Sequence, residues 1–239
     1  MSLGHNVYLI QNMDPKVREI HYIGYTTDPE RRLRQHNHGC DKGGAKKTSN
    51  RGTWKMICFV HGFPCDILGL KFEWAWQNPS TSRHLKHLSL GAKPSVKQSQ
   101  EFKLKYQLTI MFNLLNVQPW KNLWLEVHWI DRDSQCESCL ELSPNIRLTE
   151  QGFFIPKRHP ITVQTCYYCQ NKSESLYECP KCKSCSWHIE CTKESIPSCL
   201  LVPVKFECPS CHEDFYWSQM IYNRLMKGNS EDDFKDFYS

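Results

Sequence analysis

The sequence has 239 residues, of which 40% are hydrophobic and 23% charged, a composition that predicts a folded globular protein and excludes a disordered or fibrous one. Its apolar runs are too short to span a membrane, and its N-terminus MSLGHNVYLI lacks the cationic start and long apolar stretch of a signal peptide, so we expect an intracellular protein without membrane contact.

The net charge of +5 is unevenly distributed, because residues 1–135 carry 19 Lys and Arg against 11 Asp and Glu, whereas residues 136–239 carry 11 against 14. Residues 31–105 alone carry 15 against 4, which predicts either a surface for a polyanion or a solvated basic face.

The first residues are expected to form two antiparallel strands. Residues 7–10 and 19–24 are short β-prone runs, separated by a polar stretch that contains Asp14 and Pro15. Tyr8 and Tyr22 would then lie on neighbouring strands. Packing within a sheet would explain this placement as well, so by itself it assigns the two tyrosines no function.

A helix is predicted directly after the second strand. Asp28 can cap this helix, Pro29 suits its first position, and Glu30 favours its first turn. Arg32 and His36 are four residues apart and therefore share one face of the helix.

The next segments are a basic loop, a strand and an ambiguous apolar stretch. Residues 39–52 are rich in Gly and Lys, and residues 54–60 are predicted to form a strand. Residues 66–77 fit a strand by their alternating large apolar side chains, yet Asp66 is a plausible helix cap. Glu73 lies within this stretch, where an ionised carboxylate needs a cation or hydrogen-bond donors; an ordinary pairing with arginine is the alternative to a functional role.

The remaining segments predict a second domain. Residues 98–116 are expected to be mainly helical, and residues 123–130 to form a strand or an extended packing segment rich in Trp. Residues 131–165 lose clear periodicity and carry three prolines, so we place a domain boundary inside them. The acidic tail of residues 228–239 is predicted to be disordered.

The cysteine pattern predicts a zinc module in the second half. Fourteen cysteines in a chain without a secretion signal favour metal ligation over disulfides, because the cell interior keeps thiols reduced. Tetrahedral Zn²⁺ takes four ligands, so eight ligands in four closely spaced pairs predict two Zn²⁺ ions, and because protein fills every position both ions should be structural. The eight are Cys166, Cys169, Cys179, Cys182, His188, Cys191, Cys208 and Cys211.

Other thiols leave alternatives open. Cys185 could replace a member of the 179–182 pair by a change of register, and Cys199 is unassigned. Cys136 and Cys139 also have ligand spacing, but no second pair remains for them, so free thiols are favoured.

The order of the ligand pairs resembles that of the PHD and RING group of zinc modules, in which alternate pairs interleave. The resemblance implies that such a module binds another protein, and it implies two sets of ligands. One set would be Cys166, Cys169, His188 and Cys191, and the other Cys179, Cys182, Cys208 and Cys211.

The first half resembles the catalytic domain of GIY-YIG nucleases. The first motif appears as Asn6-Val7-Tyr8, without the family's glycine, and the second as Tyr22-Ile23-Gly24. Arg32 follows Tyr22 by ten residues, as the helix arginine of the family does, and His36 comes after it. Glu73 falls where the family has its metal-binding glutamate.

With its zinc module, the whole chain resembles the eukaryotic catalytic subunits of structure-specific endonucleases, which cut branched DNA together with a large scaffold subunit. The implied fold is α+β, with a small nuclease domain around a three-stranded antiparallel sheet and helices, followed by a two-zinc PHD/RING-like module. The implied parts are a nuclease domain at 1–95, a helical and extended linker region at 96–160, the zinc module at 161–227 and the tail at 228–239.

The resemblance also implies a chemistry. Glu73 would hold one catalytic Mg²⁺ or Mn²⁺, because such an ion needs few protein ligands and neutralises charge on a phosphate. Arg32 would bind the phosphate, and Tyr8 and Tyr22 would position the attacking water, with His36 assisting. Either tyrosine could be the general base. Contacts to the DNA backbone are expected from Lys42, Lys46, Lys47, Arg51, Arg83 and Lys86.

The expected setting is DNA repair and recombination in the nucleus, with branched DNA as substrate and the scaffold subunit docked on the zinc module. The free protein could self-associate when the scaffold is absent. The rival hypothesis is a non-catalytic nucleic-acid-binding protein whose zinc module reads histones or acts in a ubiquitin ligase.

Overall fold

The structure is a computed structural model that describes two compact units of the chain, Met1–Ile155 and Pro156–Ser239. The residues that it describes are 4–14, 16, 21–38, 48, 52–88, 90, 93–95, 97–134, 141–149, 153, 163–195 and 205–225. Among them, no helix is both long enough and apolar enough to span a bilayer.

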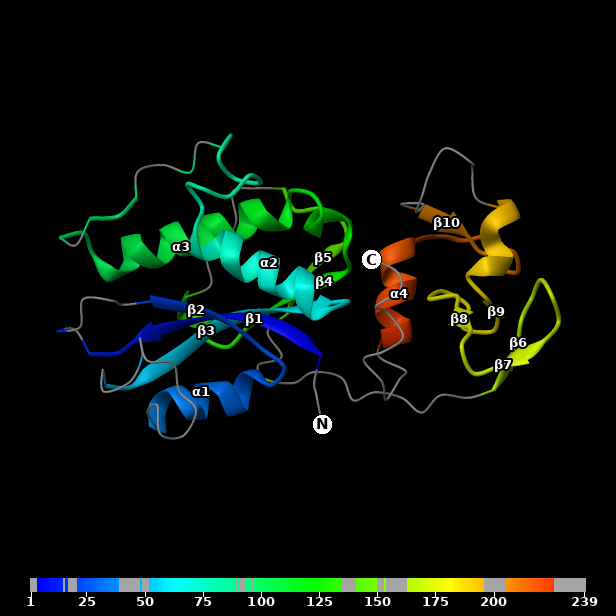
Figure 1. Cartoon of the computed structure of the whole chain (residues 1–239), viewed down its shortest axis with the longest axis horizontal. Coiled ribbons are helices and arrows are strands. Elements are labelled where there is room, and N and C mark those ends of the chain that lie inside the picture. The colour runs from blue at the N-terminus through cyan, green and yellow to red at the C-terminus, as the bar shows by residue number, and fades with distance from the viewer. Residues whose placement is uncertain are drawn as a thin grey trace. The chain divides into compact units, whose positions relative to one another are not determined.

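A mixed five-stranded sheet forms the centre of the first unit (Figure 1). Its strand order is β2-β1-β3-β4-β5, with β5 parallel to β4 and every other pair antiparallel. The strands are β1 (His5–Asn12), β2 (His21–Thr26), β3 (Trp54–Phe63), β4 (Leu125–Trp129) and β5 (Ile146–Thr149).

The expectation of a three-stranded sheet was therefore wrong in number, although the α+β class is confirmed. Strands β2, β1 and β3 correspond to the expected sheet, and β4 and β5 extend it beyond β3. The extension follows from burial: β3 is buried along nearly its whole length, and β4 pairs with it to satisfy its second edge.

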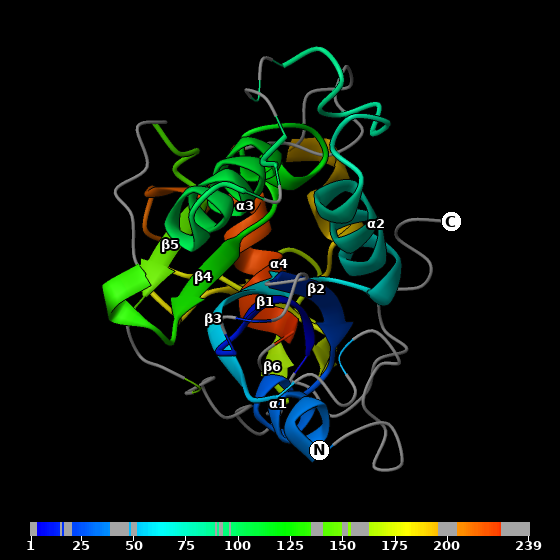
Figure 2. The same cartoon turned by 90° about the vertical axis from the view of Figure 1, so that its left-hand side faces the viewer.

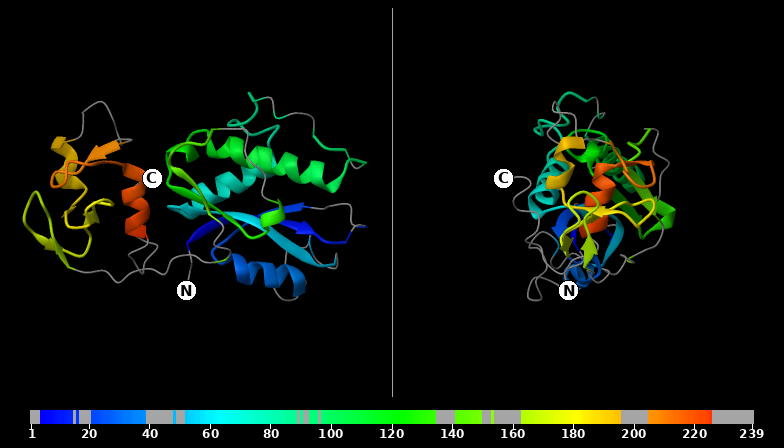
Figure 3. Two further views of the ribbon diagram at one scale, coloured as in Figure 1. Left: turned by 180° about the vertical axis from the view of Figure 1, so that it is seen from behind. Right: turned by 90° about the vertical axis from the view of Figure 1, so that its right-hand side faces the viewer.

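Helices cover both faces of this sheet (Figures 2 and 3). Helix α1 (Pro29–His38) lies on one face, while α2 (Asp66–Gln77) and α3 (Gln100–Leu115) lie on the other. The predicted start of α1 is confirmed, because Oδ1 of Asp28 accepts a hydrogen bond of 2.9 Å from the backbone N–H of Arg31.

The ambiguous stretch forms helix α2. Leu68, Phe72, Ala75 and Trp76 are buried at helical spacing, which a strand would have split between two faces. Asp66 does not cap the helix as the sequence suggested: the N-cap is Cys65, and Asp66 lies inside the first turn. Its Oδ1 accepts a 2.7 Å bond from the N–H of Ile67, and its negative charge there favours the helix dipole.

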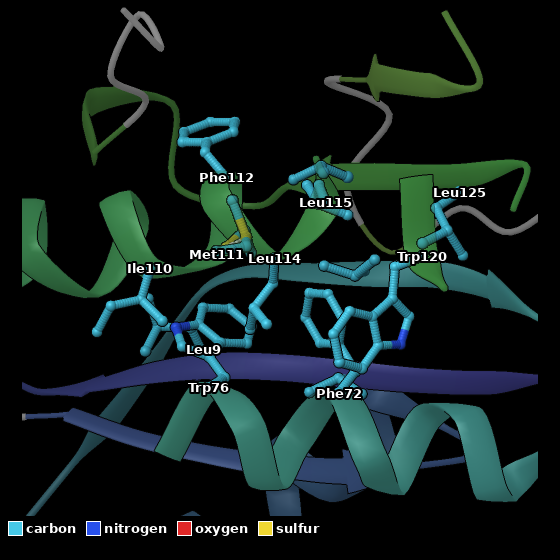
Figure 4. Packing of buried hydrophobic residues seen from close by; sticks show 14 of the residues in the cluster. Leu9, Phe72, Trp76, Ile110, Met111, Phe112, Leu114, Leu115, Trp120 and Leu125 are labelled. Atoms are coloured by element: carbon cyan, nitrogen blue, oxygen red, sulfur yellow. Dashed lines mark hydrogen bonds between the residues drawn. The ribbon is translucent and has the colours of Figure 1, made fainter. Parts of the chain in front are cut away.

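The hydrophobic core joins α2, α3 and the sheet (Figure 4). Phe72 meets the rings of Trp76 and Trp120 edge to face, at centroid distances of 5.8 and 5.2 Å. The indole N–H groups remain satisfied, since Trp76 donates to the carbonyl of Gln107 and Trp120 to that of Leu68, at 2.9 and 3.3 Å. The core therefore depends on residues that follow position 95.

The predicted linker region consequently belongs largely to the first unit. Helix α3 begins at an N-cap, Ser99, whose Oγ accepts from the N–H of Phe102 at 3.2 Å. After α3 come two short 3₁₀ helices, η2 (Trp120–Asn122) and η3 (Arg132–Ser134), which flank β4. The unit ends at Ile155, inside the segment where the sequence placed a boundary.

The second unit has little regular structure. Three two-stranded sheets pair β6 (Gln164–Thr165) with β7 (Lys172–Ser173), β8 (Tyr177–Glu178) with β9 (Ser186–Trp187), and β10 (Lys205–Glu207) with β11 (Asp214–Tyr216). The described part of this unit also contains a 3₁₀ helix, η4 (Glu190–Ser195), and helix α4 (Trp217–Leu225). Its small aromatic core contains Trp187, Phe206, Phe215 and Trp217.

A truncation tests the assignment of α3 and β4 to the first unit. We expect residues 1–155 to unfold cooperatively on heating, whereas residues 1–95 should not, because they lose the α3 side of the core and expose Phe72 and Trp76. Circular dichroism melts and amide exchange measure the difference, with the full chain as reference. A cooperative, native-like melt of residues 1–95 would contradict the assignment.

Candidate active site

A buried chain of hydrogen bonds runs from β1 to the segment before β3. Oη of Tyr8 lies 2.7 Å from Nε2 of His36, and Nδ1 of His36 lies 2.7 Å from Oγ1 of Thr48. The carbonyl of Thr48 accepts a 3.1 Å bond from the indole N–H of Trp54. Both ring nitrogens of His36 therefore have a partner, which fixes the orientation of the ring.

Thr48 was missed by the sequence analysis. It lies in the Gly- and Lys-rich loop, where no motif distinguishes it, and only its buried contact with His36 reveals it. A threonine near a predicted helix is too common to indicate such a contact from sequence.

Arg32 lies on the same face of α1 as His36, as its spacing predicts. Its Nε donates a 3.3 Å bond to Oη of Tyr8, and its Nη1 donates a 3.1 Å bond to Oε1 of Gln35. The guanidinium is thus fixed by two separate donors, one bonded to the Tyr8 hydroxyl and the other to Gln35.

Gly24 permits the close approach of the two tyrosines. Gly24 pairs with Tyr8 across β1 and β2, and a Cβ at position 24 would lie 2.3 Å from Oη of Tyr8. The ring of Tyr22 lies 6.3 Å from that of Tyr8 and 5.2 Å from that of His36, measured between centroids. Only a residue without a side chain leaves room for this cluster.

Glu73 reaches the same region from α2, around the edge of the sheet. Because β2 is the edge strand in the part of the sheet that the structure describes, no described strand pairs with its outward backbone groups. The carboxylate of Glu73 accepts a hydrogen bond from the N–H of Tyr25, and Nε2 of Gln77 donates to the carbonyl of Ile23 at 2.8 Å. The same Nε2 also donates to Oε1 of Glu73 at 3.1 Å.

The pKa shifts of these groups have common causes. Burial raises the pKa of Tyr8 and of Tyr22, Arg32 opposes both shifts, and the charge of Glu73 adds to both. Burial also raises the pKa of Glu73, again opposed in part by Arg32. Burial and the charge of Arg32 therefore act in opposite directions on the pKa of all three acidic groups.

His36 is neutral at physiological pH. Burial, followed by the charge of Arg32, lowers its pKa to about 4. A neutral imidazole presents one N–H and one unprotonated nitrogen, so it can donate one hydrogen bond and accept another from the hydroxyl of Tyr8.

The expected DNA contacts lie partly in the described chain. Arg83 and Lys86 are exposed in the turns that follow α2, and Nε of Arg83 lies 3.4 Å from Nε2 of His84. Lys42, Lys46, Lys47 and Arg51 lie outside the described residues, as do Cys136, Cys139 and Cys199.

The second unit brings the eight predicted ligands into two groups. Within each group the ligand atoms all lie within 4.8 Å of one another, and the groups interleave along the chain as the resemblance implies. The first group is Cys166, Cys169, His188 and Cys191, and the second is Cys179, Cys182, Cys208 and Cys211.

The three Cys-x2-Cys segments share one turn geometry. The residue after each second cysteine has a left-handed backbone, with φ of 60° at Gln170, 57° at Lys183 and 57° at His212. Each donates its N–H to the carbonyl of the first cysteine of its pair, at 3.0, 3.1 and 2.9 Å. The turn directs both thiols to one point, which is what chelation of a metal requires.

Cys185 stays outside the second group although it lies close to it. Its carbonyl accepts a 2.9 Å bond from the N–H of Cys179, and burial raises the pKa of its thiol to about 12. The structure thus places Cys185 beside the ligands as a buried thiol, with Cys179 and Cys182 in the group itself.

Residues 4–88 match the GIY-YIG catalytic domain, so the first unit contains a nuclease domain. The chain is 34% identical to the structure-specific endonuclease subunit slx1 of Xenopus laevis, over 92% of this chain and 88% of that protein. It is 33% identical to the SLX1 homolog of Drosophila melanogaster, over 96% and 84%, and 32% identical to SLX1 of Rattus norvegicus, over 90% and 86%. The chain belongs to this SLX1 family of endonuclease subunits.

Thr48 offers a test of the hydrogen-bond chain. Thr48→Val keeps the volume but removes the partner of His36 Nδ1, so kcat for DNA cleavage should fall about tenfold or more with little change in KM. Thr48→Ser keeps the hydroxyl and should restore most of the rate. Single-turnover rates across pH measure both variants, and equal rates for valine and wild type would exclude a positioning role.

Proposed function

We propose that this chain is the catalytic subunit of a metal-dependent structure-specific endonuclease that hydrolyses phosphodiesters in branched DNA, such as flaps, replication forks and Holliday junctions. The observation that carries the proposal is the convergence of Tyr8, Arg32, His36 and Glu73 at one edge of the sheet. Binding alone would not require a half-buried carboxylate beside an arginine and two phenols, which argues against the non-catalytic alternative.

Glu73 is the proposed ligand for a divalent ion. Its carboxylate and the nearby phenol oxygens of Tyr8 and Tyr22 are all hard oxygen donors, which suits Mg²⁺ or Mn²⁺. Such an ion, when bound, neutralises charge on the phosphate and on the leaving oxygen. The bonds from Tyr25 and Gln77 hold the carboxylate in place for this task.

Arg32 is the proposed phosphate ligand. The guanidinium is permanently charged and planar, and its bonds to Tyr8 and Gln35 fix its direction. A phosphate between Arg32 and the carboxylate of Glu73 would be held from two sides.

Tyr8 is favoured over Tyr22 as the group that takes a proton from the attacking water. The Tyr8 hydroxyl can donate a hydrogen bond to Nε2 of His36, whose Nδ1–H donates to Thr48, and this chain fixes the phenol oxygen. The pKa of the phenol would be lowered by a divalent ion held by Glu73, so that Tyr8 could lose its own proton to solvent before it takes one from the water. Tyr22 has ring contacts with Tyr8 and His36 and a side-chain hydrogen bond with Arg32, but no described hydrogen bond with a histidine, so it is better suited to orient the water.

The second unit is proposed to hold two structural Zn²⁺ ions. Seven thiols and one imidazole in two groups of four suit tetrahedral Zn²⁺ and leave no position open for chemistry. We further propose that this unit docks a scaffold subunit, in keeping with the word subunit in the relatives' names. The enzyme is proposed to act in DNA repair and recombination in the nucleus. Without the scaffold, the free chain is proposed to self-associate.

The basic residues are proposed to hold DNA by its backbone. Arg83 and Lys86 are exposed just after the helix that carries Glu73, where a strand in the active site would continue. Lys42, Lys46, Lys47 and Arg51 would add charge from the loop before β3.

Substitutions in the site test the catalytic proposal. Glu73→Gln and Arg32→Lys should each lower cleavage of a labelled flap or four-way junction in Mg²⁺ by at least about a hundredfold, while DNA affinity changes little. Asp66→Asn, which removes another carboxylate from the same helix, is the matched control and should cut normally. Undiminished cutting by Glu73→Gln would refute the role of that carboxylate.

Metal analysis tests the zinc proposal. Cys166→Ser and Cys179→Ser should each lower the zinc content below two ions per chain and increase protease sensitivity of the second unit, because metal binding supplies much of the folding energy of such modules. Cys65→Ser, in the first unit, should keep both ions. The proposal fails if Cys166→Ser retains two tightly bound zinc ions.

A further inference from the structure

Helix α2 presents an apolar stripe outward. Ile67, Leu70 and Trp74 are 53%, 44% and 52% exposed, and their spacing of three and four residues places them on one side of the helix. The core-facing residues of α2 lie on the opposite side. Contiguous apolar side chains on a surface mark a site of binding.

This stripe borders the active site. Leu70 lies three residues before Glu73, and Trp74 lies three residues before Gln77, so both neighbour the carboxylate–amide pair on the helix surface. On the other flank Lys71 is exposed, four residues after Ile67 and three before Trp74. Around α2 the surface therefore passes from the candidate metal ligand, across an apolar strip with one indole, to a cation.

That order of groups matches a nucleic acid strand better than a protein surface. A strand whose phosphate lies at Glu73 presents a base on one side of that phosphate and another phosphate beyond it. An indole can stack on the base and Lys71 can pair with the second phosphate, whereas a protein docked on the stripe would also cover Glu73.

We propose that Trp74 stacks on an unpaired base beside the scissile phosphate, with Leu70 and Ile67 extending the apolar platform and Lys71 contacting the neighbouring phosphate. The inference rests on the proposed function and adds a source of its selectivity. In an intact duplex both faces of each base are already stacked, so a free base face is offered only at a branch, an end or a single-stranded arm.

The test uses the full chain with Glu73→Gln as background, so that bound DNA is not cut. The probe is a flap with 2-aminopurine as the first unpaired base at the branch, because the chain's eight Trp residues obscure its own fluorescence changes. The variants are Trp74→Leu, which keeps an apolar helix-forming side chain but no flat ring, and Trp74→Phe, which keeps a ring. An intact duplex of the same sequence is the reference ligand.

Stacking predicts that Trp74→Leu weakens flap binding by about fivefold to a hundredfold, leaves duplex binding unchanged and abolishes quenching of 2-aminopurine. Trp74→Phe should retain most of the affinity and the quenching. Thermal melts of each variant should match the parent, since the side chain is half exposed.

Unchanged flap affinity and quenching in Trp74→Leu would overturn the inference. So would a change confined to the sedimentation of the protein or of its complex with a scaffold, which would assign the stripe to a protein partner. Neither result would count against the proposed function, because the proposed function is tested separately, by comparing DNA cleavage by the wild-type chain and by Glu73→Gln.

Discussion

The attachment of helix α2 to the open edge of strand β2 is the constraint on which the active site depends. Among the described strands, none pairs with the outer side of β2, so its N–H at Tyr25 and its carbonyl at Ile23 need other partners. Glu73 accepts from the first and Gln77 donates to the second. The bonds that complete the sheet edge thereby carry a carboxylate from the α2 side of the sheet to the tyrosines that face α1.

The opposite side of the site is built by close packing. Gly24 lets the hydroxyl of Tyr8 pass over β2, and His36 and Arg32, one helical turn apart, both meet that hydroxyl. The resulting burial raises the pKa of Tyr8 and lowers that of His36 to about 4, so without a bound metal the tyrosine keeps its proton and the histidine is a neutral hydrogen-bond acceptor. Arg32 therefore has an electrostatic role, since its charge opposes the rise in pKa that burial causes at Tyr8, Tyr22 and Glu73.

Local signals in the sequence predicted much of this arrangement. The start of α1 could be predicted because Asp28 and Pro29 act within one turn, and the Cys-x2-Cys pairs because chelation is a short-range constraint. The helical form of α2 could not be predicted, because its large apolar residues fit the pattern of a strand as well as that of a helix that is apolar on nearly every side. Only the packing of this segment between β1 and α3 decides between the two. The role of Thr48, the pairing of the predicted strand β4 with β3, and the whole of strand β5 were likewise hidden, because each depends on contacts between segments far apart in the chain.

The central claim is that Glu73 and Arg32, brought together around the edge of β2, form one site for a divalent ion and a phosphate. Anomalous diffraction from crystals soaked in Mn²⁺ tests it most directly. The account predicts a single peak in the first unit, at coordination distance from the Glu73 carboxylate and absent from Glu73→Gln crystals. A peak bound elsewhere in that unit, with Glu73 uncoordinated, would contradict it.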